Sequence, residues 1–400
     1  MTQTTRPAVP PLAVLLLIGP ISQIGITLYL PSMPAIAESL KASVGSVQLT
    51  ITVYVLVFAA AQLVLGPIAD RYGRRPVLLL GMVLFALGGV MCAVSGSIGW
   101  LLGARVLQAV GACAGMVLAR TIIRDTRTGV GAARAMSALS VALSIGPAVA
   151  PLIGAQIQDL LGWRAVFMAT AGVGLLGVVL TYLHIPETGR VGVVGFGYAR
   201  AYGALLRNFR FVAFSLGYGA TAAVFYVFLT AAPIVYIGPL GLPPAAFGFA
   251  LMAWGATAAV GGFFAAMLAG RFDSKVVALA GVAVTLFSSG VMVALAVSGL
   301  SNPFWLSVPI LMVGIGNGLS LPTAANTAMA LAPASTAGTA SALVGFSQMG
   351  CSALGSFAMS LVHHQTPLPM TAGMVVCSGL AVCLFLAGIF GGAGQINRTS

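Results

Sequence analysis

The chain has 400 residues, of which 59% are hydrophobic and 6% are charged, and its formal net charge is +12. A soluble protein needs more polar residues on its surface, so this composition predicts a protein embedded in a lipid bilayer. The basic residues lie in short connectors between apolar runs, which argues against a nucleic-acid partner and favours a role in membrane topology. The five cysteines lie inside apolar runs without a CxxC pair, so we expect no disulfide framework, metal or cofactor.

Twelve apolar segments follow one another along the chain, and each is long enough to cross a bilayer as a helix. We expect them near residues 11–31, 46–68, 76–96, 99–121, 135–158, 164–184, 211–236, 245–269, 276–298, 304–328, 336–361 and 370–391. In hydrocarbon the backbone must satisfy its own hydrogen bonds, so the prediction is an all-α membrane protein. The first segment has no A-x-A-like cleavage site after it, so a retained helix is expected rather than a signal peptide.

The distribution of basic residues predicts the orientation. With the N-terminus in the cytoplasm, fourteen basic residues fall on inner segments, and only Lys41 and Arg164 fall on outer loops. The fourteen are Arg6, Arg71, Arg74, Arg75, Arg124, Arg127, Arg134, Arg190, Arg200, Arg207, Arg210, Arg271, Lys275 and Arg398. The positive-inside rule therefore predicts a multi-pass protein of the inner membrane with both termini in the cytoplasm.

The longest connector, 186–210, is rich in glycine and basic residues and divides the chain into two six-helix bundles, 1–185 and 211–400. A weak internal repeat supports this division, because "GPIADRYGRR" at 66–75 aligns with "AMLAGRFDSK" at 266–275. Both are basic turns after the second helix of a bundle. Parallel repeats of this kind are typical of transporters whose pathway lies between the two halves.

The stretch Gly66–Pro76, "GPIADRYGRRP", places four charged residues within six positions. Gly73 suits a tight turn because glycine accepts a positive φ, and Gly66 allows a neighbouring helix to approach closely. Asp70 could pair with Arg71, Arg74 and Arg75, or with the free N–H groups at the start of another helix. A loop that only anchors topology needs neither the acid nor the two glycines, so we interpret the stretch as a gating loop.

Two of the expected helices carry further motifs. In the fourth, Arg105 and Gln108 share a face, either as a polar patch lining a cavity or as a structural contact to backbone carbonyls. The fifth contains "SIGPAVAPLIGA", where prolines remove backbone donors and glycines permit close packing. Its residues of interest are Gly146, Pro147, Pro151 and Gly154, and an ordinary packing kink is the alternative interpretation.

These motifs resemble those of a known family. Gly-x-x-x-Asp-Arg-x-Gly-Arg-Arg resembles the cytoplasmic loop signature of the major facilitator superfamily, and the fourth helix resembles its Arg-x-x-Gln-Gly motif with Ala109 replacing the glycine. The fifth helix resembles the Gly-Pro motif of the drug/proton antiporters. "LYLPSMPAIAESL", "GMVLARTIIRD" and "GWRAVF" are similar to the Bcr/CflA branch of bicyclomycin and phenicol exporters.

The resemblance implies a major facilitator fold, export of drugs by alternating access and antiport with protons, with the gating loop closing the cytoplasmic side. The sequence departs from the pattern at Thr27, where this branch usually has Asp, and at Gly270, where the second-half loop lacks the acid. No acid lies in the middle of an expected span, and His184, His363 and His364 are weak substitutes as proton carriers.

A cavity without fixed negative charge favours neutral or weakly acidic lipophilic cargo. The polar candidates for its wall are Gln23, Thr27, Tyr54, Arg105, Gln108, Tyr226, Asn317 and Asn326. Each of these could instead form a hydrogen bond between helices. The expected function is a monomeric multidrug exporter, with an importer of a small nutrient as the alternative. No set of acids and histidines is grouped for catalysis, so an enzyme is not expected.

Overall fold

The structure is a computed structural model that describes residues 9–189, 198–299, 303–333, 336–362 and 366–391. Several residues singled out above lie outside these ranges: Arg6, Arg190, His363, His364 and Arg398. Apart from one β-bridge between Ala269 and Phe272, the described residues form helices and their connections. They include twelve candidate spans that are long and apolar enough to cross a membrane, as predicted.

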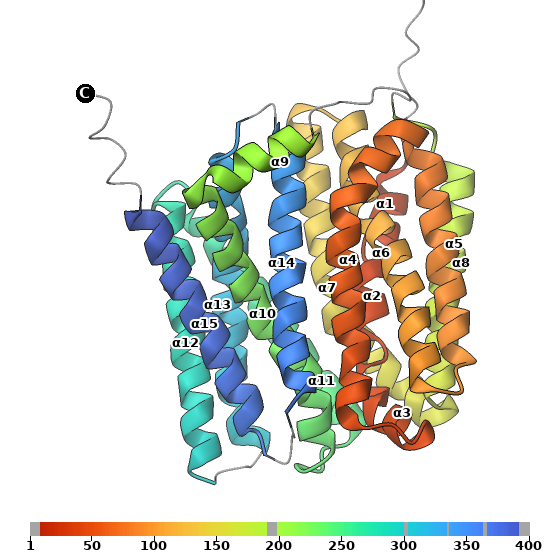
Figure 1. Ribbon diagram of the computed structural model, residues 1–400, viewed down its shortest axis with the longest axis vertical. Helices are drawn as coiled ribbons and strands as arrows, with labels where there is room; N and C mark the ends of the chain where they lie inside the picture. The colour runs from red at the N-terminus through yellow and green to blue at the C-terminus, as the bar shows by residue number, and fades with distance from the viewer. Residues whose placement is uncertain (1–8, 190–197, 300–302, 334–335, 363–365, 392–400) are drawn as a thin grey trace, which may run out of the picture. The chain divides into compact units, whose positions relative to one another are not determined.

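The elements follow the order expected from hydropathy (Figure 1). The first half contains α1 (Leu12–Ile18), α2 (Ile21–Thr27), η1 (Leu30–Ser32), α3 (Met33–Ser39), α4 (Val44–Tyr72), α5 (Arg74–Ala93), α6 (Ile98–Thr126), α7 (Gly129–Leu161) and α8 (Trp163–His184). The second contains α9 (Tyr198–Arg207), α10 (Phe209–Ile237), α11 (Pro244–Leu268), α12 (Ser274–Val297), α13 (Pro303–Ala330), α14 (Ala337–Ser360) and α15 (Leu368–Phe390).

The first span is not the single helix that the sequence predicts near 11–31. It is divided into α1, α2, η1 and α3, which together extend from Leu12 to Ser39. Pro20 lies between α1 and α2, and Pro31 lies inside the short 3-10 helix η1. Proline has no N–H group to donate to the preceding turn, so the α-helical ladder is interrupted at both places.

Packing divides the chain into two compact units. Unit 1 comprises Met1–Ser32 and Ala60–Gly195, and unit 2 comprises Met33–Ala59 and Phe196–Ser400. The long helix α4 is therefore shared, since its residues up to Ala59 belong to unit 2 and its remaining residues belong to unit 1. This grouping by packing differs from the division of the sequence at its basic connector.

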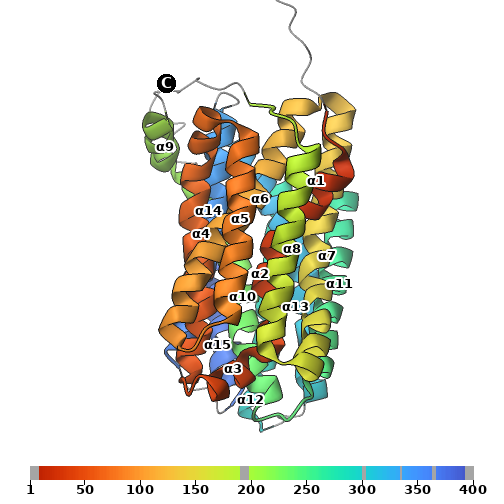
Figure 2. The ribbon, with the colours of Figure 1, turned by 90° about the vertical axis from the view of Figure 1, so that its right-hand side faces the viewer.

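In unit 1, α5 packs against α6 and α8, and α2 packs against α6 and α7 (Figure 2). Small residues make the α5–α6 contact close. A Cβ added at Gly88 would lie 2.7 Å from the backbone nitrogen of Gln108, and one added at Gly81 would collide with Ala114. Close backbone approach at glycine is a common way for membrane helices to associate without a hydrophobic driving force.

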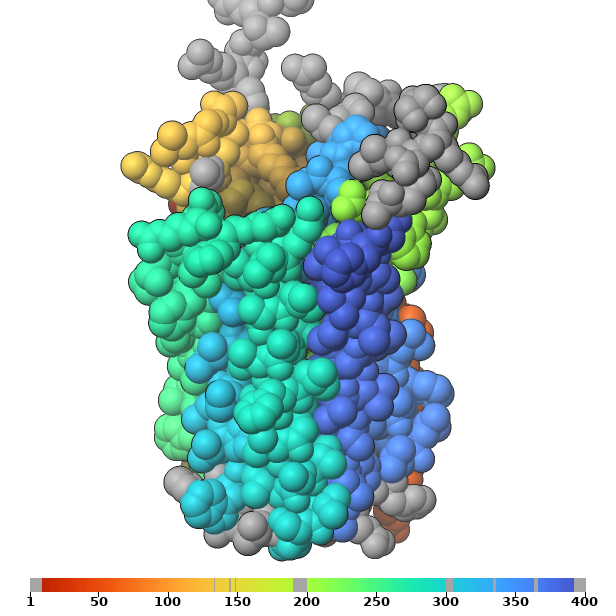
Figure 3. Space-filling model, turned by 90° about the vertical axis from the view of Figure 1, so that its left-hand side faces the viewer, coloured from red at the N-terminus to blue at the C-terminus, as the bar shows by residue number. Residues whose placement is uncertain are grey.

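In unit 2, α12 packs against α13 and α15, α10 packs against α14 and α15, and α11 packs against α13. Figure 3 shows α12 and α15 side by side on one face of this unit. The pairing of α12 with α13 and α15 matches that of α5 with α6 and α8. The third helix of each half thus packs against the fourth and the sixth helix of the same half, so the two halves share this packing pattern.

The short helix α9 lies within the connector that the sequence analysis treated as a linker, and it contacts α10 and α14 (Figure 1). Its sequence, "YARAYGALLR", is rich in alanine, leucine and arginine, which favour helix formation. It is too short to cross a membrane.

Apolar side chains are exposed along the outer surfaces of both units. On α12 and α15 they are Val276, Phe287, Val297, Leu368, Val376, Leu380 and Phe390. Such exposure would be a liability in water, and it is the expected surface of a helix that faces lipid tails.

Candidate functional site

The turn between α4 and α5 consists of one residue. Gly66 to Tyr72 belong to α4, Arg74 begins α5, and Gly73 between them has φ 98° and ψ 155°. This region of backbone conformation is essentially restricted to glycine, so the tight turn predicted at Gly73 is present. The close contact predicted at Gly66 is absent within unit 1, because no described atom there comes within 4 Å of the position of an added Cβ.

Arg74 lies between two carboxylates at this turn. Its Nη2 is 2.6 Å from Oδ1 of Asp70 on α4, and its Nε donates to Oδ2 of Asp125 on α6 at 3.1 Å. Both acids are partly exposed, so the pairs contribute little to stability, on the order of 1 kcal/mol or less each. Their effect is geometric, because they fix the end of α4, the start of α5 and the end of α6 to one another.

A third acid, Glu187, caps the N-terminus of α5. Its Oε1 accepts hydrogen bonds from the backbone N–H of Arg74 and of Gly189, both at 2.8 Å, and its Oε2 accepts from the N–H of Arg75 at 3.2 Å. A carboxylate at this place satisfies two N–H groups that have no partner within the helix, and it complements the helix dipole. A Cβ at position 73 would lie 2.5 Å from this carboxylate, so Gly73 is also required for space.

At the corresponding turn of the second half, a carboxylate also caps the following helix, and it belongs to a residue of the turn itself. Gly270 has φ 82°, and α12 begins just after Asp273. Oδ1 of Asp273 accepts from the backbone N–H of Lys275 at 2.9 Å. Each half therefore places a carboxylate at the N-terminus of its third helix. In the second half the turn itself supplies that group, whereas in the first half Glu187 supplies it from a position 113 residues away.

Arg105 forms a fully buried cluster inside unit 1. Its Nη1 donates to the backbone carbonyl of Gly25 on α2 at 2.7 Å and to Oε1 of Gln108 at 2.6 Å. Its guanidinium lies 4.4 Å from the centroid of the Tyr29 ring. Gln108 in turn donates to Oγ1 of Thr170 on α8 at 3.1 Å. The predicted shared face of Arg105 and Gln108 is present, and it connects α2, α6 and α8.

The Gly-Pro motif brings α7 against α2. A Cβ added at Gly146 would lie 3.2 Å from Cβ of Gln23, and one added at Gly154 would collide with the backbone carbonyl of Leu28. Gln23 also accepts, through its backbone carbonyl, a hydrogen bond of 2.9 Å from Oγ1 of Thr27. The two glycines thus allow the close contact between these helices.

Two prolines lie inside the same helix, at Pro147 and Pro151, and neither offers a backbone N–H. The part of α7 that contacts α2 therefore lacks two of its internal hydrogen bonds. These residues lie between the two packing glycines, so the motif combines close packing with a weakened helical ladder.

The other polar candidates lie in unit 2 and have different neighbours. Tyr54 is buried in α4, the hydroxyl of Tyr226 donates to Sδ of Met349 at 3.7 Å, and Asn326 is exposed. Asn317 is fully buried, and its Oδ1 accepts from Oγ1 of Thr285 at 3.5 Å. Its Nδ2 has no hydrogen-bond partner among the described residues.

Sequence reasoning missed Glu187. It is one of six acids in the chain and follows directly after the sixth span, in "IPETG". The small number of acids is the only feature of the sequence that draws attention to Glu187. The groups that Glu187 binds are backbone N–H groups, and those of α5 are distant along the chain, so no sequence pattern indicates them.

Comparison with known proteins supplies a family. The model described as Major Facilitator Superfamily matches residues 15–356. The chain is 31% identical to the uncharacterized MFS-type transporter YdgK of Bacillus subtilis, over 94% of this chain and 93% of that protein. It is 30% identical to the chloramphenicol resistance protein of Pseudomonas aeruginosa, over 96% of this chain and 91% of that protein. Further relatives at 29–30% identity have names that record bicyclomycin or multidrug resistance.

Solved structures agree at the level of the fold. A bacterial homologue of the human lysosomal transporter Spinster, in an inward-facing and unoccupied conformation, matches with a TM-score of 0.74 at 19% identity. The match covers 94% of this chain and 96% of that one. The relatives also confirm the narrower resemblance seen in the sequence, since they include proteins named for phenicol and bicyclomycin resistance.

Proposed function

Because the chain belongs to the Major Facilitator Superfamily, we propose that it exports small lipophilic drugs across the bacterial inner membrane. It is a multi-pass membrane transporter and not an enzyme. The observation that carries the proposal is identity of about 30%, over nearly the full length, to proteins named for antibiotic resistance. An importer of a small nutrient, the alternative, would share the fold and differ in the direction of transport.

The proposed cargo is neutral or weakly acidic. No acidic residue lies in the middle of a span, so a cationic drug would find no carboxylate to pair with. The cargo would instead meet polar neutral groups, and the unpartnered Nδ2 of Asn317 offers a hydrogen-bond donor for a carbonyl or hydroxyl oxygen. A buried donor without a partner costs free energy that a ligand oxygen would recover.

The proposed polar contacts for the cargo are Gln23 and Thr27 in unit 1, and Tyr54, Tyr226, Asn317 and Asn326 in unit 2. In this proposal Arg105 and Gln108 position α2, because the contacts of Arg105 are to protein groups in unit 1.

The proposed gate is the turn that contains Asp70, Arg71, Gly73, Arg74 and Arg75, on the cytoplasmic side. The Asp70–Arg74 pair and the Glu187 cap hold this turn in one geometry. A rigid turn can transmit a rocking motion of the 1–185 and 211–400 bundles, whereas a flexible one would absorb it. The fourteen basic residues on the inner segments support a cytoplasmic location for this turn and for both termini.

Proton antiport is part of the proposal, since the resemblance to drug/proton antiporters implies it. Thr27 stands where an acid is usual, and its hydroxyl is already bonded to the carbonyl of Gln23. In this proposal, coupling uses a titratable group away from the middle of the membrane, with His184, His363 and His364 as weak candidates. Asp70, Asp125 and Glu187 at the gating turn are the acids whose contacts change most directly if that turn moves.

The experiment is drug susceptibility of a pump-deficient bacterial host expressing this chain. Expression should raise the minimal inhibitory concentration of neutral or weakly acidic lipophilic antibiotics such as phenicols, and a protonophore should abolish intracellular drug exclusion. A protein that is present in the membrane yet changes neither susceptibility nor drug accumulation would refute export. Faster entry of a radiolabelled nutrient in the same cells would instead support the importer.

A further inference from the structure

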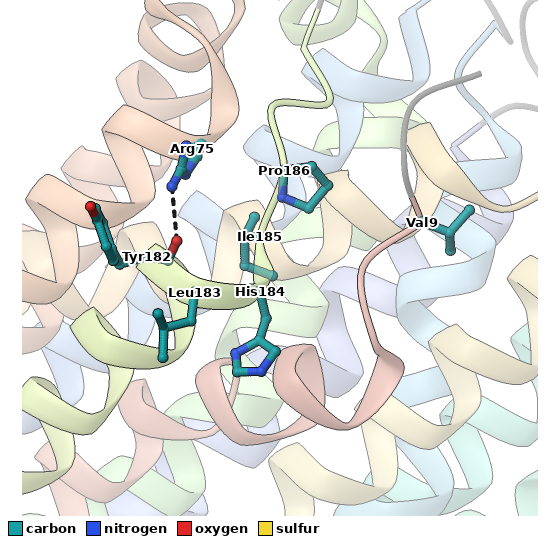
Figure 4. Close-up of a pocket in the computed structure, with 7 residues that line it drawn as sticks. All are labelled: Val9, Arg75, Tyr182, Leu183, His184, Ile185 and Pro186. Atoms are coloured by element: carbon teal, nitrogen blue, oxygen red, sulfur yellow. Dashed lines mark hydrogen bonds between the residues drawn. The ribbon is translucent and has the colours of Figure 1, made fainter. Parts of the chain in front are cut away.

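A groove lies at the end of unit 1 that contains the Gly73 turn. It is lined by Val9, Arg75, Tyr182, Leu183, His184, Ile185 and Pro186, and its volume is about 280 Å³ (Figure 4). Ligand pockets for drug-sized molecules begin at about 300 Å³, so this groove suits a smaller group. Two of its lining side chains can carry positive charge, Arg75 and His184.

Among the described residues, no ion pair joins the side chain of Arg75 or of the nearby Arg127 to a carboxylate. Nη2 of Arg75 donates to the backbone carbonyl of Tyr182 at 2.8 Å, and its Nε is buried without a partner among the described residues. Nearby, Nη2 of Arg127 donates to the backbone carbonyl of Pro10 at 3.1 Å, and its Nε is likewise buried without a described partner. Both guanidinium groups are thus oriented by neutral oxygens.

The chain has no acid left to fill this role. Of its six acids, Asp70 and Asp125 are paired with Arg74, and Glu187 is occupied by backbone N–H groups. Of the other three, Asp159 lies near the far end of α7, and Glu38 and Asp273 belong to unit 2. Neither segment adjoining the groove in sequence, 1–8 or 190–197, contains an acidic residue. A compensating anion must therefore come from outside the chain.

The surface beside the groove is suited to lipid. The membrane span α8 exposes an apolar stripe that ends at the groove, where Leu183 is 64% exposed. The stripe consists of Leu175, Leu176, Val179, Tyr182 and Leu183. These positions recur every three to four residues and so share one face of the helix. An acyl chain lying along this face would have its headgroup at the level of Arg75 and His184.

We propose that the groove binds a phosphate group carried by an anionic phospholipid, with Arg75 and His184 contacting the phosphate and the α8 stripe contacting an acyl chain. Basic pockets at the membrane surface attract anionic headgroups, and each basic residue contributes about a fivefold change in binding. The inference does not depend on the direction of transport or on the drug that is transported. It adds a lipid to the molecules that this protein recognises.

Native mass spectrometry of the purified full chain in detergent tests the proposal. Phosphatidylglycerol and phosphatidylethanolamine with identical acyl chains are added in turn, and the bound fraction of each is measured. The variants are His184→Gln, Arg75→Gln and, as a control, Arg271→Gln, which removes one charge from the matching turn of the second half. The side chain of His184 is exposed and forms no hydrogen bond with another described residue, so His184→Gln removes no described hydrogen bond of unit 1.

The expected result is preferential binding of phosphatidylglycerol, reduced about fivefold by Arg75→Gln, reduced to a smaller extent by His184→Gln and unchanged by Arg271→Gln. Equal binding of the two lipids, or equal losses in all three variants, would overturn the proposal. Inorganic phosphate added at millimolar concentration distinguishes a phospholipid headgroup from free phosphate as the source of the bound phosphate group. If it displaces phosphatidylglycerol from the wild-type protein, the groove is a site for free phosphate and the lipid assignment is wrong; retention of the lipid supports it.

Discussion

Replacement of Gly73 by alanine is the most direct test of the Glu187 cap. At φ 98° and ψ 155° any residue with a Cβ is strained by about 1–3 kcal/mol. The new methyl group would also lie 2.5 and 2.9 Å from the carboxylate of Glu187, which would have to leave the N-terminus of α5. Loss of an N-terminal cap costs about 0.5–2 kcal/mol, with the lower part of that range appropriate to an exposed acid. The sum predicts that Gly73→Ala lowers the free energy of unfolding by about 2–4 kcal/mol.

Gly162 provides a matched control in the same unit. It also links two helices by a single residue, its φ is 79° and its ψ is 171°, and an added Cβ meets nothing within 4 Å. Gly162→Ala should therefore incur the backbone strain without the loss of a cap. The difference between the two alanine variants, about 1 kcal/mol, isolates the contribution of Glu187.

The assay is unfolding of the purified protein in detergent, by heat and by denaturant, for Gly73→Ala, Gly162→Ala, Glu187→Gln and the Gly73→Ala/Glu187→Gln double variant. Because Gly73→Ala already displaces the carboxylate, adding Glu187→Gln should cost less in that background than in the wild type. Equal losses for the two alanine variants, together with additive effects in the double variant, would refute the capping argument.

Three further outcomes are expected. Asp70→Asn removes the charge that pairs with Arg74, so drug export should fall at least tenfold while the amount of protein in the membrane, measured by immunoblot, stays unchanged. Arg105→Lys loses the planar guanidinium, whose Nη1 donates to Gly25 and Gln108 and which lies over the Tyr29 ring, so both thermal stability in detergent and export should decrease. Gly154→Ala should destabilise the protein because its methyl group collides with the first span, whereas Gly172→Ala, which meets open space, should be neutral or stabilising by up to about 1 kcal/mol.

The twelve spans could be predicted because membrane insertion depends on a property that hydropathy measures directly, namely about 20 successive apolar residues. The same measure fails where a helix continues beyond the apolar region. α4 extends to Tyr72, past the edge near 68 that was expected, because its last turn is polar yet still helical. The loop that the sequence suggested around Asp70 is therefore the end of a helix, and only Gly73 separates it from the next.

Contacts between distant segments were predictable only where residue chemistry left few choices. The pairing of Asp70 with an arginine of its own stretch was one of two expected arrangements, and the structure shows the Arg74 pair. The other arrangement, a carboxylate at a helix N-terminus, occurs as well, but Glu187 provides it. A backbone N–H has no side-chain signature, so no pattern in the sequence indicates which acid will bind it.

The origin of the Glu187 cap has a mechanical consequence. In the second half, Asp273 caps α12 from the turn itself, so movement of other segments leaves that cap intact. In the first half the cap comes from the start of the basic connector, so any displacement of the connector pulls on the turn at Gly73. Because the carboxylate is exposed, water can replace it at the N–H groups, and its release costs only about 1 kcal/mol. A contact of that strength positions the turn and can be released without a large cost in free energy.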